Sequence, residues 1–271
     1  MLAFKVIAQP ARILLFRHGQ SAQNVAAAQM PLGAKALWAI HQLFGSTVSK
    51  PLLLATDRLS GRSSKSPIED RHAPLTDLGV EQALLTGREL PALGIQPDVI
   101  LTSTFFRTML SGANINRGMV DAGGRAVPTN AFDFLIERQE GRLDGFPRAY
   151  LPVLEPEQSR LYFEYSKSGR LHLYRPPGGE SMLDTYQRVT DPLLETLAKF
   201  PDQTVLIVGH GVTNMCIRSF LLQEDFVAAV NARSYRMPNL ALMDFRWQAD
   251  LGRWVLDPQT AERQVFTGAR K

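Results

Sequence analysis

Short apolar runs alternate along the chain with stretches whose apolar residues recur every three or four positions. Runs bounded by Gly, Pro or polar residues predict buried strands at residues 11–16, 97–103, 125–130, 204–209 and 240–247. The periodic stretches predict four helices. The first begins at an N-cap Thr76, and the second covers about 105–119. The third begins with a capping box of Ser181 and Asp184, and the fourth spans 212–222. Strands that are apolar throughout and alternate with helices indicate an α/β fold, with a mostly parallel sheet covered on both faces.

Two segments interrupt this alternation. Residues 25–71 join the first strand to the Thr76 helix and include an apolar stretch that predicts a further helix. Residues 131–177 mix aromatic and charged residues with several prolines. At 271 residues the chain is long enough for one large domain, so we expect a single domain over residues 1–271. Insertions of this size usually sit at the carboxyl edge of the sheet, where we expect both to form a wall or lid of the pocket.

Composition narrows the function classes. The chain is 45% hydrophobic and 21% charged, with a net charge of +4 that only weakly favours anionic partners. Its basic residues are spread along the chain and no apolar run is long enough to span a bilayer, so we expect neither a nucleic-acid nor a membrane partner. The single cysteine, Cys216, and the lack of a signal sequence favour a cytoplasmic protein. The oligomeric state stays open, with a homodimer as one option.

Candidate chemistry gathers at the ends of the predicted strands. Arg17 and His18 close the first strand, and His210 follows residues 204–209 directly. Ligands of open α/β sheets bind at this carboxyl edge, where an unpaired imidazole adds nothing to a core. Arg107 falls in the first turn of the next helix after Ser103, where a cation works against the helix dipole unless an anion lies in front of it. These positions predict a site for an anion.

The residue types suggest which anion. The guanidinium groups of Arg17 and Arg107 match phosphate oxygens in a bidentate way, and the 212–222 helix offers free backbone N–H groups at its start. Glycines after each histidine, Gly19 and Gly211, let the backbone approach a ligand closely. An imidazole can attack phosphorus and hold the phosphoryl group covalently. The pattern therefore predicts a phosphate site that contains a nucleophile.

Six motifs, in order, resemble those of the histidine phosphatase superfamily, also called phosphoglycerate mutase-like: RHGQSAQN, PLTDLGVEQA, LTSTFFRT, IERQEGRLDG, PPGGESMLDTYQRV and VGHGVTN. They reach from residue 12 to about 222. The resemblance implies a three-layer α/β/α sandwich and a phosphorylated nucleophile, His18. It further implies that Glu137 protonates the leaving alcohol, aided by a pKa raised through burial and phosphate charge. It assigns the phosphate pocket to Arg17, Asn24, Arg107, His210 and Gly211.

Other polar residues near these motifs have simpler interpretations. Glu140 is the alternative acid to Glu137, whereas Glu180 reads as a structural glutamate beside the site. Ser21 either assists the phosphate or caps the following helix. We expect ordinary helix, loop or core roles for His41, His72, His172 and Cys216. No metal-binding spacing or nucleotide-binding glycine pattern is present, so we expect metal-independent catalysis and no cofactor.

Three functions fit the motifs. The leading one is hydrolysis of a small phosphate monoester. The runner-up is phosphoglycerate mutase-type transfer. Against it, residues 25–71 are longer than the mutases' link, Glu140 replaces their tyrosine, and their paired arginines are missing. Other arginines, Arg148, Arg160, Arg170 and Arg175, could contribute in their place. A non-catalytic binder of phosphorylated ligands is the third, although it would normally lack the nucleophile or a pocket arginine.

Overall fold

A computed structural model describes residues 8–28, 70–145, 151–232 and 237–258. Its centre is a six-stranded sheet with the order β3-β2-β4-β1-β5-β6. The strands are β1 (Arg12–Arg17), β2 (Val99–Ser103), β3 (Thr129–Phe132), β4 (Thr204–Gly209), β5 (Leu242–Gln248) and β6 (Arg253–Leu256). Strands β1 to β4 run parallel, while β5 pairs antiparallel with β1 and with β6. The expected mostly parallel α/β sheet is confirmed.

Alternate residues of each central strand face opposite layers. In β1, Ile13 and Leu15 join one buried cluster, and Leu14 and Phe16 join the other. Successive side chains of a strand point to opposite faces, so a strand that is apolar throughout needs a cover on both sides. This explains the unbroken apolar run ILLF and gives the sandwich its two cores.

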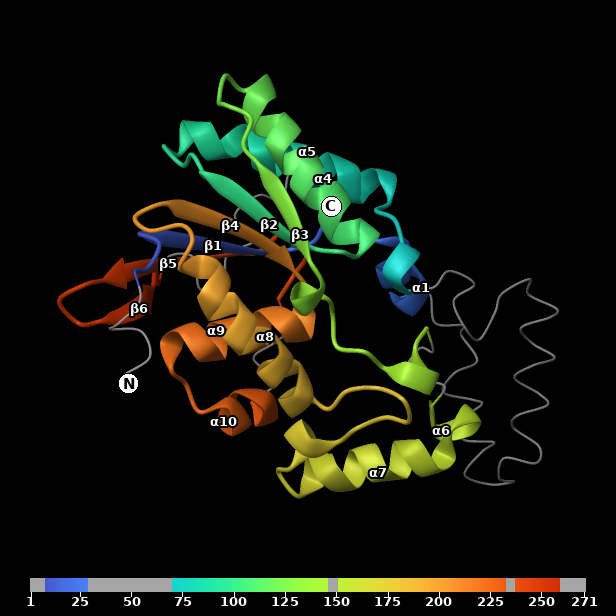
Figure 1. The fold of residues 1–271 in the computed structure, drawn as a ribbon. Helices are drawn as coiled ribbons and strands as arrows, with labels where there is room; N and C mark the ends of the chain where they lie inside the picture. The colour runs from blue at the N-terminus through green and yellow to red at the C-terminus, as the bar shows by residue number, and fades with distance from the viewer. Residues whose placement is uncertain (1–7, 29–69, 146–150, 233–236, 259–271) are drawn as a thin grey trace.

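Helices supply both covers (Figure 1). One face carries α4 (Asp77–Ala92) and α5 (Phe106–Asp121), and the other carries α8 (Met182–Leu197), α9 (Gly211–Leu222) and α10 (Phe226–Asn231). Apolar residues of α8 and α9 complete one cluster, and those of α4 and α5 complete the other. The three-layer α/β/α architecture expected from the motifs is therefore confirmed. The described residues contain no helix long and apolar enough to cross a bilayer.

Both predicted helix starts are present. The Thr76 side chain accepts a hydrogen bond from the Gly79 N–H at the start of α4. Ser181 and Asp184 form the reciprocal capping box at the start of α8. Each of these signals lies within four residues, so it acts before tertiary packing does.

One predicted strand boundary is wrong, and two features of the sheet were not predicted. The third strand begins at residue 129 rather than 125, directly after Pro128, which has no N–H for a sheet hydrogen bond. The last long strand, β5, runs antiparallel to β1, and the hairpin partner β6 was not predicted. A run of four residues such as β6 is too short for its pattern to separate it from a loop.

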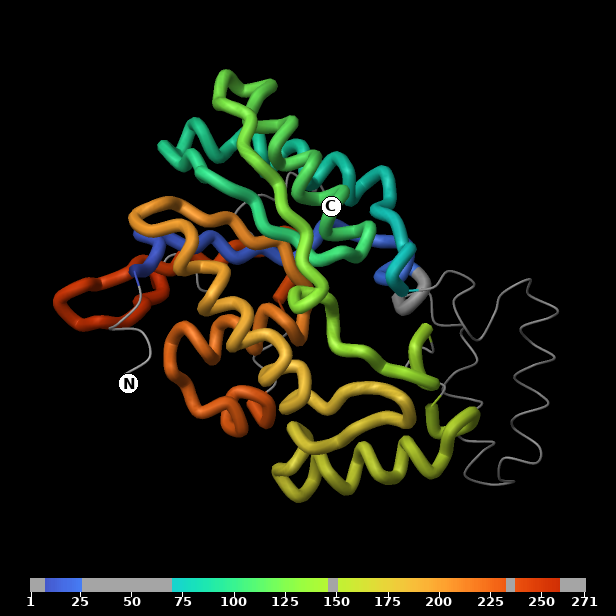
Figure 2. The backbone as a smooth tube through the Cα atoms, in the orientation of Figure 1, coloured from blue at the N-terminus to red at the C-terminus, as the bar shows by residue number. Residues whose placement is uncertain are grey.

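The two inserted segments differ in what the structure describes. Of residues 25–71, the end of α1 (Ala22–Ala28) and the start of η1 (Asp70–His72) are described, and the helix predicted between them lies outside the described residues. Residues 131–177 begin in β3 and contain η2 (Asp133–Leu135), η3 (Gly141–Leu143), α6 (Leu151–Leu154), α7 (Pro156–Lys167) and η5 (Leu171–Leu173). Figure 2 shows the backbone after β3 leaving the sheet toward α6 and α7.

Candidate active site

His18 directly follows β1, and its N–H donates to the carbonyl oxygen of Gly209 at the end of β4. Its ring Nδ1 lies 2.7 Å from the carbonyl oxygen of Gly19. A carbonyl oxygen can only accept, so Nδ1 carries the proton and Nε2 carries the lone pair. Burial and the positive charges of Arg107 and Arg17 lower the pKa of His18 well below its usual range. The ring is therefore neutral at pH 7, with its lone pair on Nε2.

Arg17 is held by a segment from the far end of the chain. Its Nη1 donates to the carbonyl oxygen of Met237 over 2.6 Å, and its own carbonyl oxygen accepts from the Leu240 N–H. The neighbouring Asn239 donates to the carbonyl oxygen of His18 over 2.7 Å. The buried Nε of Arg17 has no partner among the described residues, so this guanidinium keeps donor capacity for a ligand.

His210, fully buried after β4, lies edge-on to His18 with 5.3 Å between ring centroids. Its Nε2 is 2.8 Å from the Ser103 hydroxyl at the end of β2, which in turn contacts the Thr108 hydroxyl over 2.7 Å. Burial, followed by the positive charge of Arg107, lowers the pKa of His210 well below its usual range. The strand-end histidines thus meet at one edge of the sheet, as expected from parallel strands.

Arg107 has an anion in front of it, and that anion belongs to the protein. Its Nη1 and Nη2 bind the two carboxylate oxygens of Asp70 over 2.9 and 3.1 Å, and Nη1 also donates to the Asp70 carbonyl oxygen. The Arg107 side chain is only 4% exposed. Asp70 therefore engages three of the five N–H groups of this guanidinium, and the other two have no hydrogen bond to the residues that the structure describes.

Glu137 lies at the start of α9. Its carboxylate accepts hydrogen bonds from the N–H groups of Val212 and Thr213 over 3.2 to 3.3 Å, and its Oε1 also accepts from the Arg138 N–H over 2.9 Å. Its charge also acts on Arg17. The helix N-terminus that was expected to hold phosphate thus donates two of its N–H groups to this carboxylate. Gly211, the first residue of α9, directly precedes those two donors.

Asn24 and Ser21 cap α1 together. The Oδ1 of Asn24 accepts from the N–H and the hydroxyl of Ser21 and from Asn239. The N–H of Asn24 donates back to the Ser21 hydroxyl. Ser21 therefore has its capping role. With its oxygen engaged in this way, Asn24 has only its amide N–H groups to offer a ligand.

Gly19 is required by packing between backbones. A Cβ added there would lie 2.6 Å from the carbonyl oxygen of Gly79, and one at Gly79 would lie 2.0 Å from the carbonyl oxygen of Gln20. The backbone that Gly19 approaches is the first turn of α4, whereas the sequence had suggested close approach to a ligand. This contact presses the loop that carries His18 against α4.

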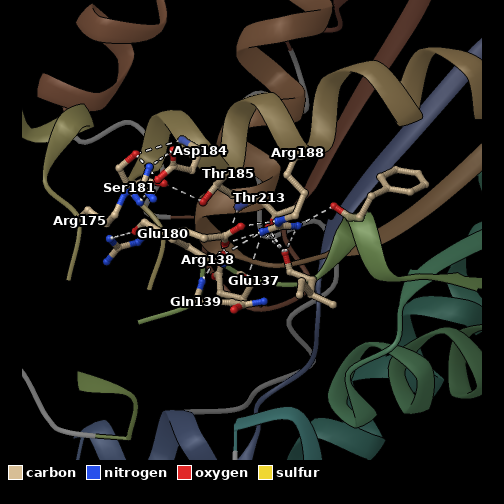
Figure 3. Close-up of polar contacts among 12 residues, drawn as sticks. Glu137, Arg138, Gln139, Arg175, Glu180, Ser181, Asp184, Thr185, Arg188 and Thr213 are labelled. Atoms are coloured by element: carbon tan, nitrogen blue, oxygen red, sulfur yellow. Dashed lines mark hydrogen bonds and ion pairs between the residues drawn. The ribbon is translucent and has the colours of Figure 1, made fainter. Parts of the chain in front are cut away.

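Glu140 and Glu180 are both held in ion pairs near Glu137. Glu140 pairs with Arg138, whose side chain is 3% exposed. Figure 3 shows Arg138 and Glu180 beside Glu137. Glu180 forms a two-point pair with Arg188 of α8 over 2.7 and 2.9 Å. Glu140 is therefore tied to a buried cation, whereas Glu137 accepts only backbone and hydroxyl donors among the described residues.

The remaining candidates lie in simpler surroundings. His72 is exposed and packs edge-on to Phe106, and His172 lies in η5. Cys216 lies in a buried apolar cluster, which raises the pKa of its thiol. His41 falls outside the described residues. Within residues 8–28, 70–145, 151–232 and 237–258, no group of three or more His, Cys, Asp or Glu side chains could hold a metal ion.

Three important contacts escaped the sequence analysis. Asp70, Asn239 and Arg188 meet Arg107, His18 and the backbone around Glu137, respectively. Asp70 begins the one-turn helix η1 and Asn239 lies outside the helices and strands, and no spacing in the sequence tells which partner a lone carboxylate or amide will meet. Arg188 is predicted to lie on a helix, but its side chain reaches a segment that the helical pattern does not describe.

Together these residues form a polar site at the carboxyl edge of the sheet. A neutral imidazole with its Nε2 lone pair lies within electrostatic range of two guanidinium groups. The carboxylate of Glu137 and a second neutral imidazole complete the set. Such a set can bind a phosphate group, attack it and exchange a proton with the departing oxygen.

Known proteins resemble this chain in sequence and in fold. Two curated 2,3-bisphosphoglycerate-dependent phosphoglycerate mutases match it. The one from Methylobacterium sp. (strain 4-46) is 32% identical over 149 residues, or 52% of this chain and 65% of its own length. The one from Methylorubrum populi is 29% identical over 188 residues, or 66% of this chain and 81% of its own length.

Solved structures share the fold at lower identity. The alpha-ribazole phosphatase from Shigella flexneri has a TM-score of 0.63 at 16% identity, covering 91% of this chain and 94% of its own. The mycobacterial glucosyl-3-phosphoglycerate phosphatase in complex with VO3 has a TM-score of 0.61 at 20% identity, covering 91% and 97%.

The family model for the histidine phosphatase superfamily (branch 1) matches residues 63–257, which is more than half of the chain. The Arg17-His18-Gly19 motif lies before this range, but β1 places it beside β4, where His210 follows. The chain belongs to the histidine phosphatase superfamily.

Proposed function

We propose that the protein hydrolyses a small phosphate monoester through a phosphohistidine at His18. The observation that carries the proposal is the protonation state of His18. Its Nδ1 proton is used on Gly19, and its lowered pKa keeps the ring neutral, so the Nε2 lone pair is available beside Arg17 and Arg107. A nucleophile of this kind divides phosphoryl transfer into two easier steps.

In the first step, Nε2 of His18 attacks phosphorus and the bond to the ester oxygen breaks. Glu137, protonated when the phosphate brings its negative charge beside it, gives its proton to the departing alkoxide. In the second step, water attacks the phosphohistidine and gives a proton to the Glu137 carboxylate. The P–N bond breaks, inorganic phosphate leaves and the His18 lone pair returns. Arg17 and Arg107 stabilise the charge on the transferred group in both steps.

The test is to trap the intermediate. Brief reaction with a radiolabelled substrate, followed by rapid quenching, should leave an acid-labile, alkali-stable phosphoryl group on the peptide that contains His18. His18→Ala should abolish the label and the activity, whereas the exposed-histidine control His72→Ala should retain both. Label on His210 instead, or a His18→Ala protein as active as wild type, contradicts the proposal. Binding of phosphorylated ligands with no turnover would favour the non-catalytic alternative.

Mutase-type transfer is the second candidate, because the two curated relatives described above are mutases. A mutase must hold the acidic product beside the phosphohistidine and exclude water, which needs several basic contacts. Of the arginines that could have supplied them, Arg160 pairs with Glu164 and Arg175 pairs with Asp184. These pairings support hydrolysis.

The two reactions can be separated with one substrate mixture. The protein is given 3-phosphoglycerate with a catalytic amount of 2,3-bisphosphoglycerate, and 2-phosphoglycerate and free phosphate are followed together. We expect phosphate release to dominate. Isomerisation that outruns phosphate release by about tenfold would establish the mutase reaction instead.

A further inference from the structure

Arg188 makes an unusually complete set of contacts beside the site. From α8, its Nε and Nη2 bind the two oxygens of the Glu180 carboxylate over 2.7 and 2.9 Å. Its Nη1 donates to the carbonyl oxygen of Phe134 over 2.8 Å, and both Nη atoms lie 3.3 Å from the carbonyl oxygen of Ile136. One guanidinium therefore ties a carboxylate to the backbone just before Glu137 (Figure 3).

Glu180 continues the chain of contacts to the other side of Glu137. Its Oε2 accepts from the Gln139 N–H over 3.0 Å, and its own N–H donates to the Gln139 carbonyl oxygen over 2.8 Å. The Arg138 guanidinium adds a hydrogen bond to the Glu180 carbonyl oxygen. The ion pair of Arg188 and Glu180 thus makes hydrogen bonds with the backbone of residues 134, 136 and 139, on both sides of Glu137.

Regular structure does not hold this segment. The short helix η2 ends at Leu135 and η3 begins at Gly141, so the residues between them lie in no helix or strand. The Arg188 and Glu180 side chains are 21% and 17% exposed, so water reaches this ion pair only in part. A two-point pair between a guanidinium and a carboxylate also fixes orientation, which a lysine cannot do in the same way.

We propose that Arg188 and Glu180 are positioning residues that hold Glu137 at the distance needed for proton transfer to the leaving group. The proposal rests on the proposed function of Glu137. Neither residue needs to touch the substrate. Proton transfer in the transition state requires hydrogen-bond reach, and a misplacement of about 1 Å can cost on the order of 10²-fold in rate.

The leaving group provides the readout. An alkoxide needs a proton as it departs, whereas p-nitrophenolate is stable without one, so misplacing the acid slows alkyl esters selectively. Four single variants are compared: Arg188→Gln, Arg188→Lys, Glu180→Gln and Glu137→Gln. A double variant combines Glu137→Gln with Arg188→Gln. The control is Arg218→Gln, because Arg218 on α9 forms a similarly half-buried pair with Glu224. For each, kcat/KM is measured with glycerol phosphate and with p-nitrophenyl phosphate.

We expect Arg188→Gln and Glu180→Gln to lower the alkyl-to-aryl ratio of kcat/KM by about tenfold or more, with KM for the aryl ester nearly unchanged. Arg188→Lys should retain more of the ratio than Arg188→Gln. The double variant should fall no lower than Glu137→Gln alone, because residues that act through one group are not additive. Glu180→Gln keeps the size of its side chain, so it carries the test if Arg188→Gln fails to fold.

Equal losses with both esters, or the same ratio change in Arg218→Gln, would overturn the proposal and leave a purely structural role. A ratio that falls in Glu137→Gln but not in Arg188→Gln or Glu180→Gln overturns this proposal alone. A ratio unchanged in Glu137→Gln overturns the acid role in the proposed function, and with it the positioning role.

Discussion

The Ser103 hydroxyl and Nε2 of His210 share a hydrogen bond of 2.8 Å at the carboxyl edge of the sheet. The same hydroxyl accepts from the Phe105 N–H and contacts the Thr108 hydroxyl, which donates to the Phe105 carbonyl oxygen over 2.8 Å. Every donor in this set is used if Ser103 donates to Thr108 and His210 donates to Ser103. His210 therefore carries its proton on Nε2, and its buried Nδ1 has a lone pair without a partner in the described part of the chain.

This tautomer leads to a prediction about ligand binding. A phosphate dianion bound beside His210 favours the protonated imidazole. We therefore expect His210 to take up a proton on Nδ1, which has no partner among the described residues, when phosphate or vanadate binds. Nitrogen-15 NMR should show the neutral Nε2–H tautomer without ligand and the doubly protonated ring with vanadate. Calorimetry in buffers of different ionisation enthalpy should show net proton uptake, which Ser103→Ala should reduce. An Nδ1–H tautomer in the free protein would contradict the assignment.

Asp70 should weaken the affinity of the site for anions, because it shares the positive charge of Arg107. Asp70→Asn keeps the size of the side chain and removes its charge. We expect inorganic phosphate to bind more tightly to this variant by about tenfold, measured by calorimetry at low ionic strength. Asp121→Asn is the control, because it makes the same charge change in an exposed pair with Arg88 at the other end of α5. Unchanged or weaker binding would mean that Asp70 mainly orients Arg107.

Catalysis should need no divalent cation, since Arg17 and Arg107 supply the positive charge. Activity with p-nitrophenyl phosphate should survive dialysis against EDTA, and vanadate should inhibit it. Arg107→Lys should lose on the order of 10²-fold in kcat/KM, because a lysine lacks the planar fork, whereas Arg88→Lys should be near wild type. Activity that vanishes with EDTA and returns with Mg²⁺ contradicts the prediction.

The two buried histidines should make stability depend on pH. Their lowered pKa values keep His18 and His210 neutral in the folded protein, while the unfolded chain protonates them below about pH 6.5. The unfolded state then binds more protons, so the free energy of unfolding falls as the pH drops. The loss is about 1.4 kcal/mol per pH unit for each histidine, until the folded pKa is reached. Urea titrations at pH 7 and pH 5 should show a smaller fall in the free energy of unfolding for His18→Gln than for the wild type. An equal fall in both proteins would contradict the lowered pKa of His18.

The parts of the fold that the sequence predicts are those with a local physical cause. The Thr76 cap and the Ser181 capping box act within one helical turn, and the apolar run of β1 requires cover on both faces. The direction of β5 has no such local cause, because an apolar run suits a parallel or an antiparallel neighbour equally. Only the hairpin with the four-residue β6 distinguishes the two, and that strand is too short for its pattern to be recognised.

The contacts of the site also fall into those that the sequence could predict and those that it could not. His18 and His210 could be expected to meet because parallel strands end at one edge of a sheet. The partners of charged side chains could not be predicted, since Coulomb attraction is non-specific and the loops decide which charges come close. Asp70 on Arg107 and Arg188 on the backbone before Glu137 are examples.

The place of β1 in the sheet constrains how the protein is made. Among the strands that the structure describes it comes first along the chain, whereas both of its neighbours, β4 and β5, follow α8. The apolar segment from Ile13 to Phe16 therefore lacks both of these partners while the residues up to β4 are synthesised. Pairing across so many residues is slow and leaves the segment open to aggregation in the meantime. A translating chain thus cannot place His18 beside His210 until β4 has been made, so products truncated before β4 lack this arrangement.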